Sequence, residues 1–264
     1  MASPDTLLVI PSYCDGARLA GYLPGLCAAL SGFTGGVRVQ VVDDGSPQAE
    51  QLWLAAEVDR LRRIYDFLPP LLAQAKNAGK GSAIRAGWAT AGGAMRWLAF
   101  VDADGAAPAA EVVALLERAR NSVASPAVFI AVRTKRSDKP VRRFWHRQIG
   151  SRLFNAWVRR CLDLQFSDTQ CGLKVVPAPF VNETVWREDR FAFDLELLLR
   201  ARAVNLPVFT QSIAWNEQPG SSLGPGAMVG LFSAVWRLRR FKCETSISSA
   251  VHRRSGISAS RAPH

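Results

Sequence analysis

An apolar run that ends in two carboxylates is the feature that most constrains this chain. Residues 97–101 are all apolar, and Asp102, Ala103 and Asp104 follow at once. The run predicts a buried strand, and its end is where open α/β folds bind ligands. Because residues i and i+2 of an extended segment point the same way, Asp102 and Asp104 can converge on one Mg²⁺ or Mn²⁺. The alternative is that Asp102 caps the next helix and Asp104 is a solvated turn residue.

Strand and helix patterns alternate through the first half of the chain. Strands are expected over 6–10, 37–42, 71–73, 97–101 and 127–132. Helices are expected over 17–30, from Ser46-Pro47 to about 62, from the turn at 77–81 to about 90, and over 108–120. Ser46 should be the N-cap of the second helix, with Pro47 as its first residue. This alternation predicts an α/β fold, with a mostly parallel central sheet and helices on both faces.

Two more of the expected strands end in polar residues. One is followed by Pro11-Ser12-Tyr13, and the other by Asp43-Asp44-Gly45-Ser46. Since neighbouring parallel strands bring such ends to one edge, a nucleotide-sized crevice is expected there. Asp43 or Asp44 could accept hydrogen bonds from a base or a ribose. Alternatively, both are turn residues that place charge at a helix start.

The Gly79-Lys80-Gly81 turn opens a helix but matches no common phosphate-binding motif. Gln74 and Ile84 occupy positions where the Walker A loop and the dinucleotide fingerprint require glycine. Backbone N–H groups at the helix start, together with Lys80, could still hold an anion. A solvated Lys80 is the alternative.

The net charge of +11 is clustered. Between Arg133 and Arg160 there are ten Lys or Arg residues and one acid, Asp138. Within this segment Trp145, Ile149, Leu153 and Trp157 form an apolar stripe, while Arg147 and Ser151 share another face. Tryptophan beside arginine on an amphipathic helix is typical of helices at a membrane surface. The alternative is a helix packed on the core with a solvated basic face. Residues 228–242 are a second candidate of this kind.

Composition excludes several other classes of protein. The five cysteines are scattered, as in reduced cytosolic proteins, and three histidines are too few for a His-rich metal site. No apolar stretch reaches the ~20 residues of a spanning helix, and no targeting peptide is expected. Residues 1–243 should form one domain, and 244–264 a disordered basic tail. A non-catalytic, basic nucleic-acid-binding protein stays open as an alternative.

Six motifs in order resemble family 2 glycosyltransferases of the GT-A fold, especially the dolichyl-phosphate glucosyltransferase and mannose synthase group. The resemblance runs from about residue 7 to residue 240. The motifs are 42–46, 77–81, 101–105, 168–174, 193–196 and 215–221, of which Asp168 to Lys174 is the most specific.

The resemblance implies an inverting hexosyltransferase with a nucleotide-sugar donor, Mg²⁺ or Mn²⁺, and a polyprenyl-phosphate acceptor. UDP-glucose is the expected donor, with GDP-mannose or a soluble acceptor as alternatives. The protein should be cytoplasmic and peripheral on the inner face of an anionic membrane, and it should not bind nucleic acid. Asp102 and Asp104 would hold the metal, and Arg147 and Ser151 would grip the acceptor phosphate. Other substrate-binding candidates are Pro11, Tyr13, Asp15, Asp43, Asp44, Lys80, Asp102, Arg133, Asp168, Gln170 and Glu196.

The chain departs from the family pattern at three places. Ala106 stands where mannose synthases often carry a metal-side glutamine, which matches the glucosyltransferase variant better. Ala131-Val132 replace the Gly-Ser that usually precedes the arginine matched by Arg133, and Ser222 replaces a lysine. A phosphate acceptor is already anionic at pH 7 and needs no protein base. An alcohol acceptor would need one, which Asp168, Asp194 or Glu196 could supply.

Overall fold

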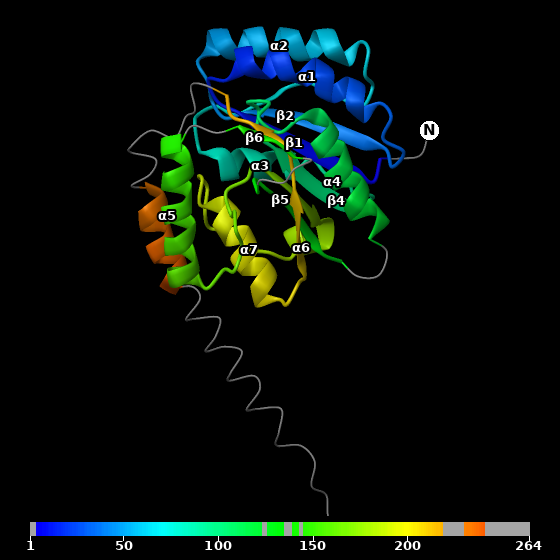
Figure 1. Cartoon of the computed structure of the whole chain (residues 1–264). Coiled ribbons are helices and arrows are strands. Elements are labelled where there is room, and N and C mark those ends of the chain that lie inside the picture. Colours follow the sequence, from blue (N-terminus) through cyan, green and yellow to red (C-terminus); the bar gives the residue numbers. More distant parts are fainter. Residues whose placement is uncertain (1–3, 123–125, 135–138, 143–144, 219–229, 241–264) are drawn as a thin grey trace, which may run out of the picture.

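The chain folds around one seven-stranded sheet (Figure 1). The structure is a computed structural model that describes residues 4–122, 126–134, 139–142, 145–218 and 230–240, with only the backbone of 145–148. Its strands are β1 (Thr6–Ser12), β2 (Val37–Asp43), β3 (Leu72–Ala73), β4 (Trp97–Val101), β5 (Val128–Val132), β6 (Val141–Arg142), β7 (Leu173–Pro177), β8 (Val208–Ser212) and β9 (Trp215–Asn216). Its labelled helices are α1 (Gly16–Leu30), α2 (Gln48–Arg62), α3 (Lys80–Trp88), α4 (Ala109–Asn121), α5 (Trp145–Leu162), α6 (Ala178–Asn182) and α7 (Phe193–Ala203).

The strand order is β3-β2-β1-β4-β7-β5-β8, and β6 pairs with β9 separately. Strand β7 runs antiparallel to both its neighbours, and every other pairing in the main sheet is parallel. The expected α/β fold with a mostly parallel sheet is therefore confirmed. Strands β7 and β8 were not expected from the sequence, because Lys174 interrupts the first and the second is only partly buried.

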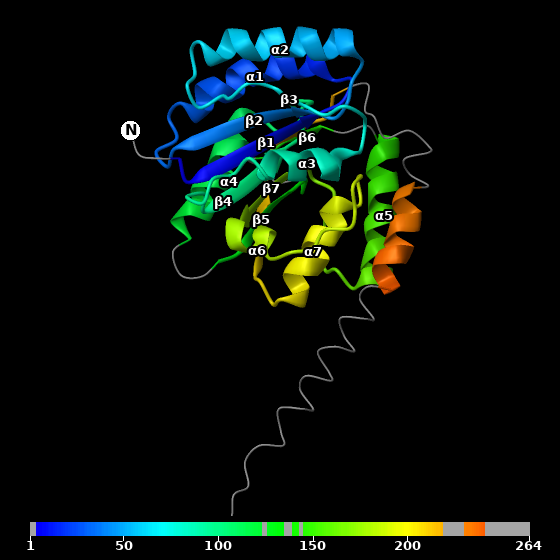
Figure 2. The same cartoon turned by 180° about the vertical axis from the view of Figure 1, so that it is seen from behind.

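Helices cover both faces of the sheet (Figures 1 and 2). Leu8 and Ile10 of β1 face the cluster built with α1 and α4, whereas Leu7 and Val9 face the cluster built with α3 and α7. Helix α2 packs on α1. Because both faces are covered, β4 and β5 are apolar throughout rather than alternating.

The start of α2 differs from expectation by one residue. The helix begins at Gln48 with Pro47 as N-cap, and not with Ser46 as N-cap. The Ser46 hydroxyl instead donates to Asp43 Oδ2 at 2.6 Å and accepts from the Cys14 amide at 2.9 Å. The Ser46 hydroxyl therefore links the end of β2 to the loop after β1, and it does not cap α2.

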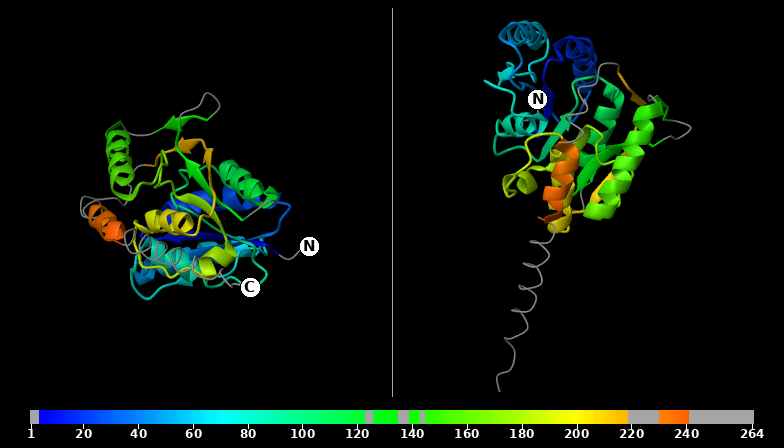
Figure 3. Two further views of the ribbon diagram at one scale, coloured as in Figure 1. Left: turned by 90° about the horizontal axis from the view of Figure 1, so that it is seen from below. Right: turned by 90° about the vertical axis from the view of Figure 1, so that its left-hand side faces the viewer.

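Helix α5 and the helix over residues 230–240 lie side by side (Figure 3). Helix α5 packs on the core through Phe154, Val158 and Leu162. The described members of the expected apolar stripe, Ile149, Leu153 and Trp157, are exposed instead. None of the helices among the described residues has the length and hydropathy of a membrane-spanning segment. The expected tail and the 220–222 motif lie outside the described residues.

Candidate functional site

Three loops meet at the carboxyl edge of the sheet, as the sequence predicted. In the register of β1 and β2, Ser12 is opposite Asp43, and on the other side Val9 of β1 is opposite Phe100 of β4. The Asp44 amide donates to the Ser12 carbonyl at 2.8 Å. The segments after Pro11, Asp43 and Val101 therefore form one edge, where parallel α/β sheets bind their ligands.

The two aspartates at the end of β2 accept hydrogen bonds from the chain itself. Asp43 accepts hydrogen bonds from the Ser46 amide at 2.8 Å and from Gln51 Nε2 at 2.9 Å, besides the Ser46 hydroxyl. Asp44 accepts from the amides of Ala78 at 2.9 Å and Gly79 at 2.8 Å. Burial raises the pKa of Asp44, and these two amides oppose the shift. Asp44 thus ties the end of β2 to the start of α3.

Asp102 caps no helix, because α4 begins only at Ala109, with Pro108 as its N-cap. One carboxylate oxygen, Oδ1, lies 2.7 Å from Lys80 Nζ. The other oxygen lies against Gly172, where an added Cβ would be only 1.7 Å from Oδ2. The Asp102 amide also donates to the Gly172 carbonyl at 2.9 Å. Asp102 is therefore held between Lys80 on one side and the Gly172 backbone on the other.

Asp104 follows in the same loop, and its Oδ1 accepts the Ala106 amide at 3.0 Å. Burial raises its pKa, and the charge of Asp102 adds to the increase. The two carboxylates therefore repel each other, and a cation between them would relieve that repulsion. No third Asp, Glu, His or Cys joins them in a ligand cluster among the described residues. Both fit a hard divalent cation that takes its remaining ligands from phosphate oxygens and water.

Lys80 belongs to a chain of alternating charges that runs into the core. Besides Asp102, its Nζ lies 3.3 Å from Asp194 Oδ2, and Lys174 holds the other oxygen of Asp194. Lys174 is buried and also donates to the Cys171 carbonyl at 2.7 Å. Burial alone would raise the pKa of Asp194, but Lys174 and Lys80 lower it. The solvated Lys80 considered from the sequence is therefore wrong.

Arg133 and Asp168 form a further ion pair. Nε and Nη2 of Arg133 donate to Oδ2 and Oδ1 of Asp168 at 2.6 and 2.8 Å, and the Arg133 amide donates to Oδ2 at 3.2 Å. Burial opposes ionisation of Asp168, but the guanidinium outweighs it and lowers the pKa to about 2. The Arg133 guanidinium also lies 4.9 Å from the ring centroid of Trp215.

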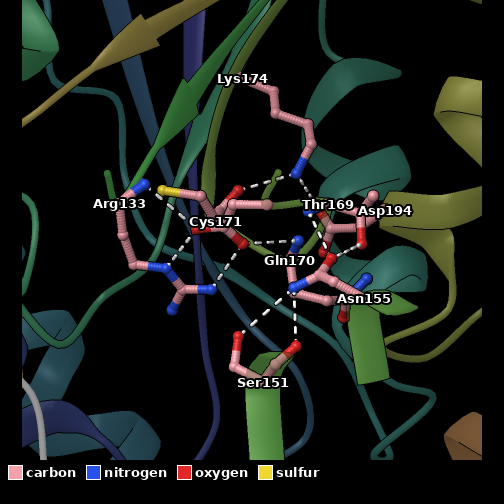
Figure 4. A network of polar contacts seen from close by, with 9 residues as sticks. Arg133, Ser151, Asn155, Thr169, Gln170, Cys171, Lys174 and Asp194 are labelled. Carbon is pink, nitrogen blue, oxygen red and sulfur yellow. Dashed lines mark hydrogen bonds and ion pairs between the residues drawn. The ribbon is translucent and has the colours of Figure 1, made fainter. Parts of the chain in front are cut away.

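Helix α5 is joined to this region through Asn155 (Figure 4). Asn155 Oδ1 accepts the Thr169 hydroxyl at 3.0 Å and its amide at 3.2 Å, while Nδ2 donates to the Ser151 carbonyl at 2.9 Å. Ser151 is thus placed near the 168–174 segment. Arg147 precedes it by one turn of α5, and its side chain lies outside the described part of the chain.

The remaining residues predicted to bind substrate are Pro11, Tyr13, Asp15, Gln170 and Glu196. The Gln170 amide donates to Asp168 Oδ1 at 3.2 Å, and its buried Nε2 has no partner among the described residues. Glu196 is buried and accepts from the Arg187 and Glu188 amides at 2.9 and 2.7 Å, and from Arg200. Pro11 is half-buried, Tyr13 is exposed, and Asp15 pairs with Arg18. A cavity of about 430 Å³ is lined by Cys14, Asp15, Ala17, Arg18, Glu50 and Trp53.

Sequence reasoning assigned no role to three residues that shape this site. Gly172 makes room for Asp102, Lys174 supports Asp194, and Asn155 attaches α5. Lys174 carried a usable signal, because a charge inside a strand whose other residues are apolar needs a buried partner. Gly172 lies in the 168–174 motif, but nothing in the local sequence shows that it makes room for Asp102 or that Asn155 attaches α5.

The sequence of this chain is similar to those of known glycosyltransferases. Residues 8–178 match the family described as Glycosyl transferase family 2. A dolichyl-phosphate beta-glucosyltransferase of Drosophila melanogaster is 29% identical over 234 residues, covering 84% of this chain and 70% of that protein. One of Trichomonas vaginalis is 28% identical over 222 residues, covering 77% and 62%. The chain therefore spans less than two thirds of the length of the second relative.

Solved structures show the same fold. Glucosyl-3-phosphoglycerate synthase from Mycobacterium tuberculosis superposes with a TM-score of 0.63 at 15% identity, covering 89% of this chain and 80% of that one. The same enzyme in complex with Mn²⁺, UDP and glucosyl-3-phosphoglycerate gives a TM-score of 0.57 at 14% identity, covering 93% and 79%. With the match over residues 8–178, the chain belongs to glycosyl transferase family 2 and has the GT-A fold.

Proposed function

We propose that this chain transfers glucose from UDP-glucose to a polyprenyl phosphate, with inversion at the anomeric carbon. The relatives named dolichyl-phosphate beta-glucosyltransferase support both the sugar and the class of acceptor. Ala106, two residues after Asp104, supports the glucosyl rather than the mannosyl variant.

The observation that carries the proposal is the state of the three carboxylates that could serve as a base. Asp168 is bound by Arg133 and has a pKa of about 2, and Asp194 lies between two lysines. Glu196 is buried and accepts hydrogen bonds from two amides and one arginine. The lowered pKa values of Asp168 and Asp194 make them weak bases, and both oxygens of Glu196 are occupied by N–H donors, so an alcohol would not be activated by these groups. A phosphate monoester carries its own negative charge, since its second pKa is about 6.

The work of the protein is then to bring two anions together. Asp102 and Asp104 would hold Mg²⁺ or Mn²⁺, which would neutralise charge on the departing nucleoside diphosphate. Arg147 and Ser151 would grip the acceptor phosphate from α5, while Arg133 holds the carboxylate of Asp168. Positioning by fixed cationic groups is the main contribution expected when the nucleophile needs no activation.

A polyprenyl acceptor places the reaction at a membrane surface. We propose that the protein is cytoplasmic and peripheral, on the inner face of the membrane. The exposed basic surface of α5 and of residues 230–240 supports this position, because cytoplasmic leaflets carry anionic lipids.

Two measurements test the proposal. In the first, thermal unfolding is followed with UDP or GDP in the presence of Mn²⁺, and UDP should stabilise the protein more than GDP does. At ~100 times its Kd, UDP should add about 2.7 kcal/mol to the free energy of unfolding of the protein without nucleotide. In the second, labelled UDP-glucose is offered with a polyprenyl phosphate, the matching polyprenol, or a small phosphorylated acid. Transfer to the polyprenyl phosphate alone is expected. A larger shift with GDP would favour mannose, and transfer to the small acid would replace the lipid acceptor.

A further inference from the structure

Two neighbouring helices expose one continuous apolar surface. We call it the helix-pair face and define it as Ile149, Leu153 and Trp157 of α5 with Phe232 and Trp236 of the 230–240 helix. Their exposed fractions are 49%, 68%, 39%, 43% and 50%, respectively. The Phe232 ring lies 5.7 Å from that of Phe154 and 6.4 Å from that of Trp157, so the two helices present a single surface.

This surface is left over after both helices have packed on the core. Helix α5 buries Phe154, Val158 and Leu162, and the second helix buries Leu231, Val235 and Leu238. The exposed residues recur every four positions on the other side of each helix. Large apolar side chains gathered on one exposed surface mark a site of interaction with a protein or a membrane.

Arginines surround the helix-pair face, and neither helix contains an acidic residue. Six arginines of the two helices are exposed in the described residues, and Arg237 among them pairs with Glu188. The other five are Arg152, Arg159, Arg160, Arg239 and Arg240. None of these five forms an ion pair with a carboxylate of the described residues, whereas Arg60 and Arg62 of α2 each pair with an acid three residues earlier. The Arg239 guanidinium lies 5.1 Å from the ring of Trp236. The partner of this surface should therefore be anionic and apolar at once.

We propose that the helix-pair face docks on an anionic lipid bilayer, with its apolar side chains among the acyl chains and its arginines on the lipid phosphates. A nucleic acid would match the arginines but would leave Leu153 and Ile149 without a favourable contact. A second copy of the chain would match the apolar residues but would bring two sets of arginines face to face. A bilayer satisfies both requirements.

The position of Ser151 connects this surface to the site. Ser151 lies on α5 between Ile149 and Leu153, and Asn155 in the next turn holds the helix to Thr169. Docking through this helix would therefore bring a lipid-borne phosphate toward the 168–174 segment. The docking surface deepens the peripheral position proposed above. The consequence for the acceptor phosphate rests on the proposed transfer to a polyprenyl phosphate, which the docking itself does not require.

The test is co-sedimentation of the full chain with vesicles of phosphatidylcholine, with or without 30% phosphatidylglycerol. The wild type should bind only the anionic vesicles and should dissociate at high salt. Substituting Arg159 and Arg160 by Gln should weaken binding roughly 25-fold, since each arginine contributes about fivefold. The triple variant Leu153→Ala, Trp157→Ala, Trp236→Ala should weaken it at least tenfold. Leu52→Ala, at a position 65% exposed on α2, is the matched control and should bind like the wild type.

The proposal is overturned if the wild type ignores anionic vesicles, or if the triple variant binds them like Leu52→Ala. It is also overturned if sedimentation velocity shows a dimer that the triple variant abolishes, or if RNA competes fully with the vesicles. Transfer of glucose to a polyprenyl phosphate in detergent micelles separates this proposal from the proposed function. The triple variant should keep that activity, while losing activity on acceptor embedded in vesicles.

Discussion

Lys80 and Asp102 form an ion pair in which Nζ lies 2.7 Å from Oδ1 of the carboxylate. The same Nζ contacts Asp194, so Lys80 joins the surface loop that carries Asp102 to a buried carboxylate. Burial opposes the charge on Lys80, but Asp102 and Asp194 raise its pKa and keep it protonated. Any role of Lys80 in the reaction is therefore coupled to that of Asp102.

A double-mutant cycle should reveal this coupling. Lys80→Met and Asp102→Asn should each lower kcat/KM at least ~10²-fold, as expected when an electrostatic contact to the transition state is lost. Together they should cost little more than the worse single change, because neighbours in one network are not additive. Arg62→Met, which removes an exposed ion pair on α2, is the control and should be near wild type. If the fold-losses of kcat/KM in the two single variants multiply in the double variant, Lys80 contacts the substrate independently of Asp102.

Gly172→Ala should impair the same site by steric displacement. The new Cβ would lie 1.7 Å from Asp102 Oδ2, so the carboxylate must turn away from its present position beside Lys80. We expect weaker Mn²⁺ binding, measured by electron paramagnetic resonance, and a ~10²-fold loss of transfer with a retained circular dichroism spectrum.

Gly92→Ala is the matched control for that substitution, since an added Cβ at Gly92 meets nothing within 4 Å. Equal Mn²⁺ binding and equal turnover in the two alanine variants would show that the present orientation of Asp102 is unimportant.

Stability in acid should depend on the ion pair of Asp168 with Arg133. The pKa of Asp168 is about 2 in the folded chain, against an ordinary value of 3.8. A lowered folded pKa contributes stability above the unfolded value, and that contribution is lost as pH falls from about 4 to 2. The loss should be on the order of 2 kcal/mol.

Thermal unfolding at about pH 5 and about pH 2.5 checks this expectation. The decrease in melting temperature between the two pH values should be smaller in Asp168→Asn than in the wild type. Asp59→Asn, at an exposed ion pair of α2, should keep the wild-type decrease. An unchanged pH dependence in Asp168→Asn would contradict the lowered pKa.

The acceptor site should require a guanidinium at position 147, and the ammonium group of a lysine should not replace it. A guanidinium can bind a phosphate through two parallel hydrogen bonds, which an ammonium cannot reproduce. Arg147→Lys should therefore transfer poorly to a polyprenyl phosphate, and Arg147→Ala should be worse. Slow hydrolysis of the donor by water should continue in both variants and serves as the internal control. Wild-type transfer by Arg147→Ala would remove this residue from the acceptor site.

The sequence by itself determined the order and type of the central elements and the edge at which the site lies. Strand periodicity and the polar residues that end β1, β2 and β4 are local properties, so they could be recognised without contacts. Element starts were less certain, as Ser46 shows, because its hydroxyl had a tertiary partner in Asp43. The antiparallel strand β7 was missed, because its single charge masks the apolar pattern.

Only the tertiary structure decided which charges are paired. Lys80 and Asp194 are 114 residues apart, and Arg133 and Asp168 are 35 apart. No local pattern reports such pairings, yet they determine which carboxylates are held as weak bases. The same is true of the apolar stripe on α5, whose periodicity predicts an amphipathic helix but not which face packs. Phe154 and Val158 pack in the core, and Leu153 and Trp157 therefore remain exposed to solvent.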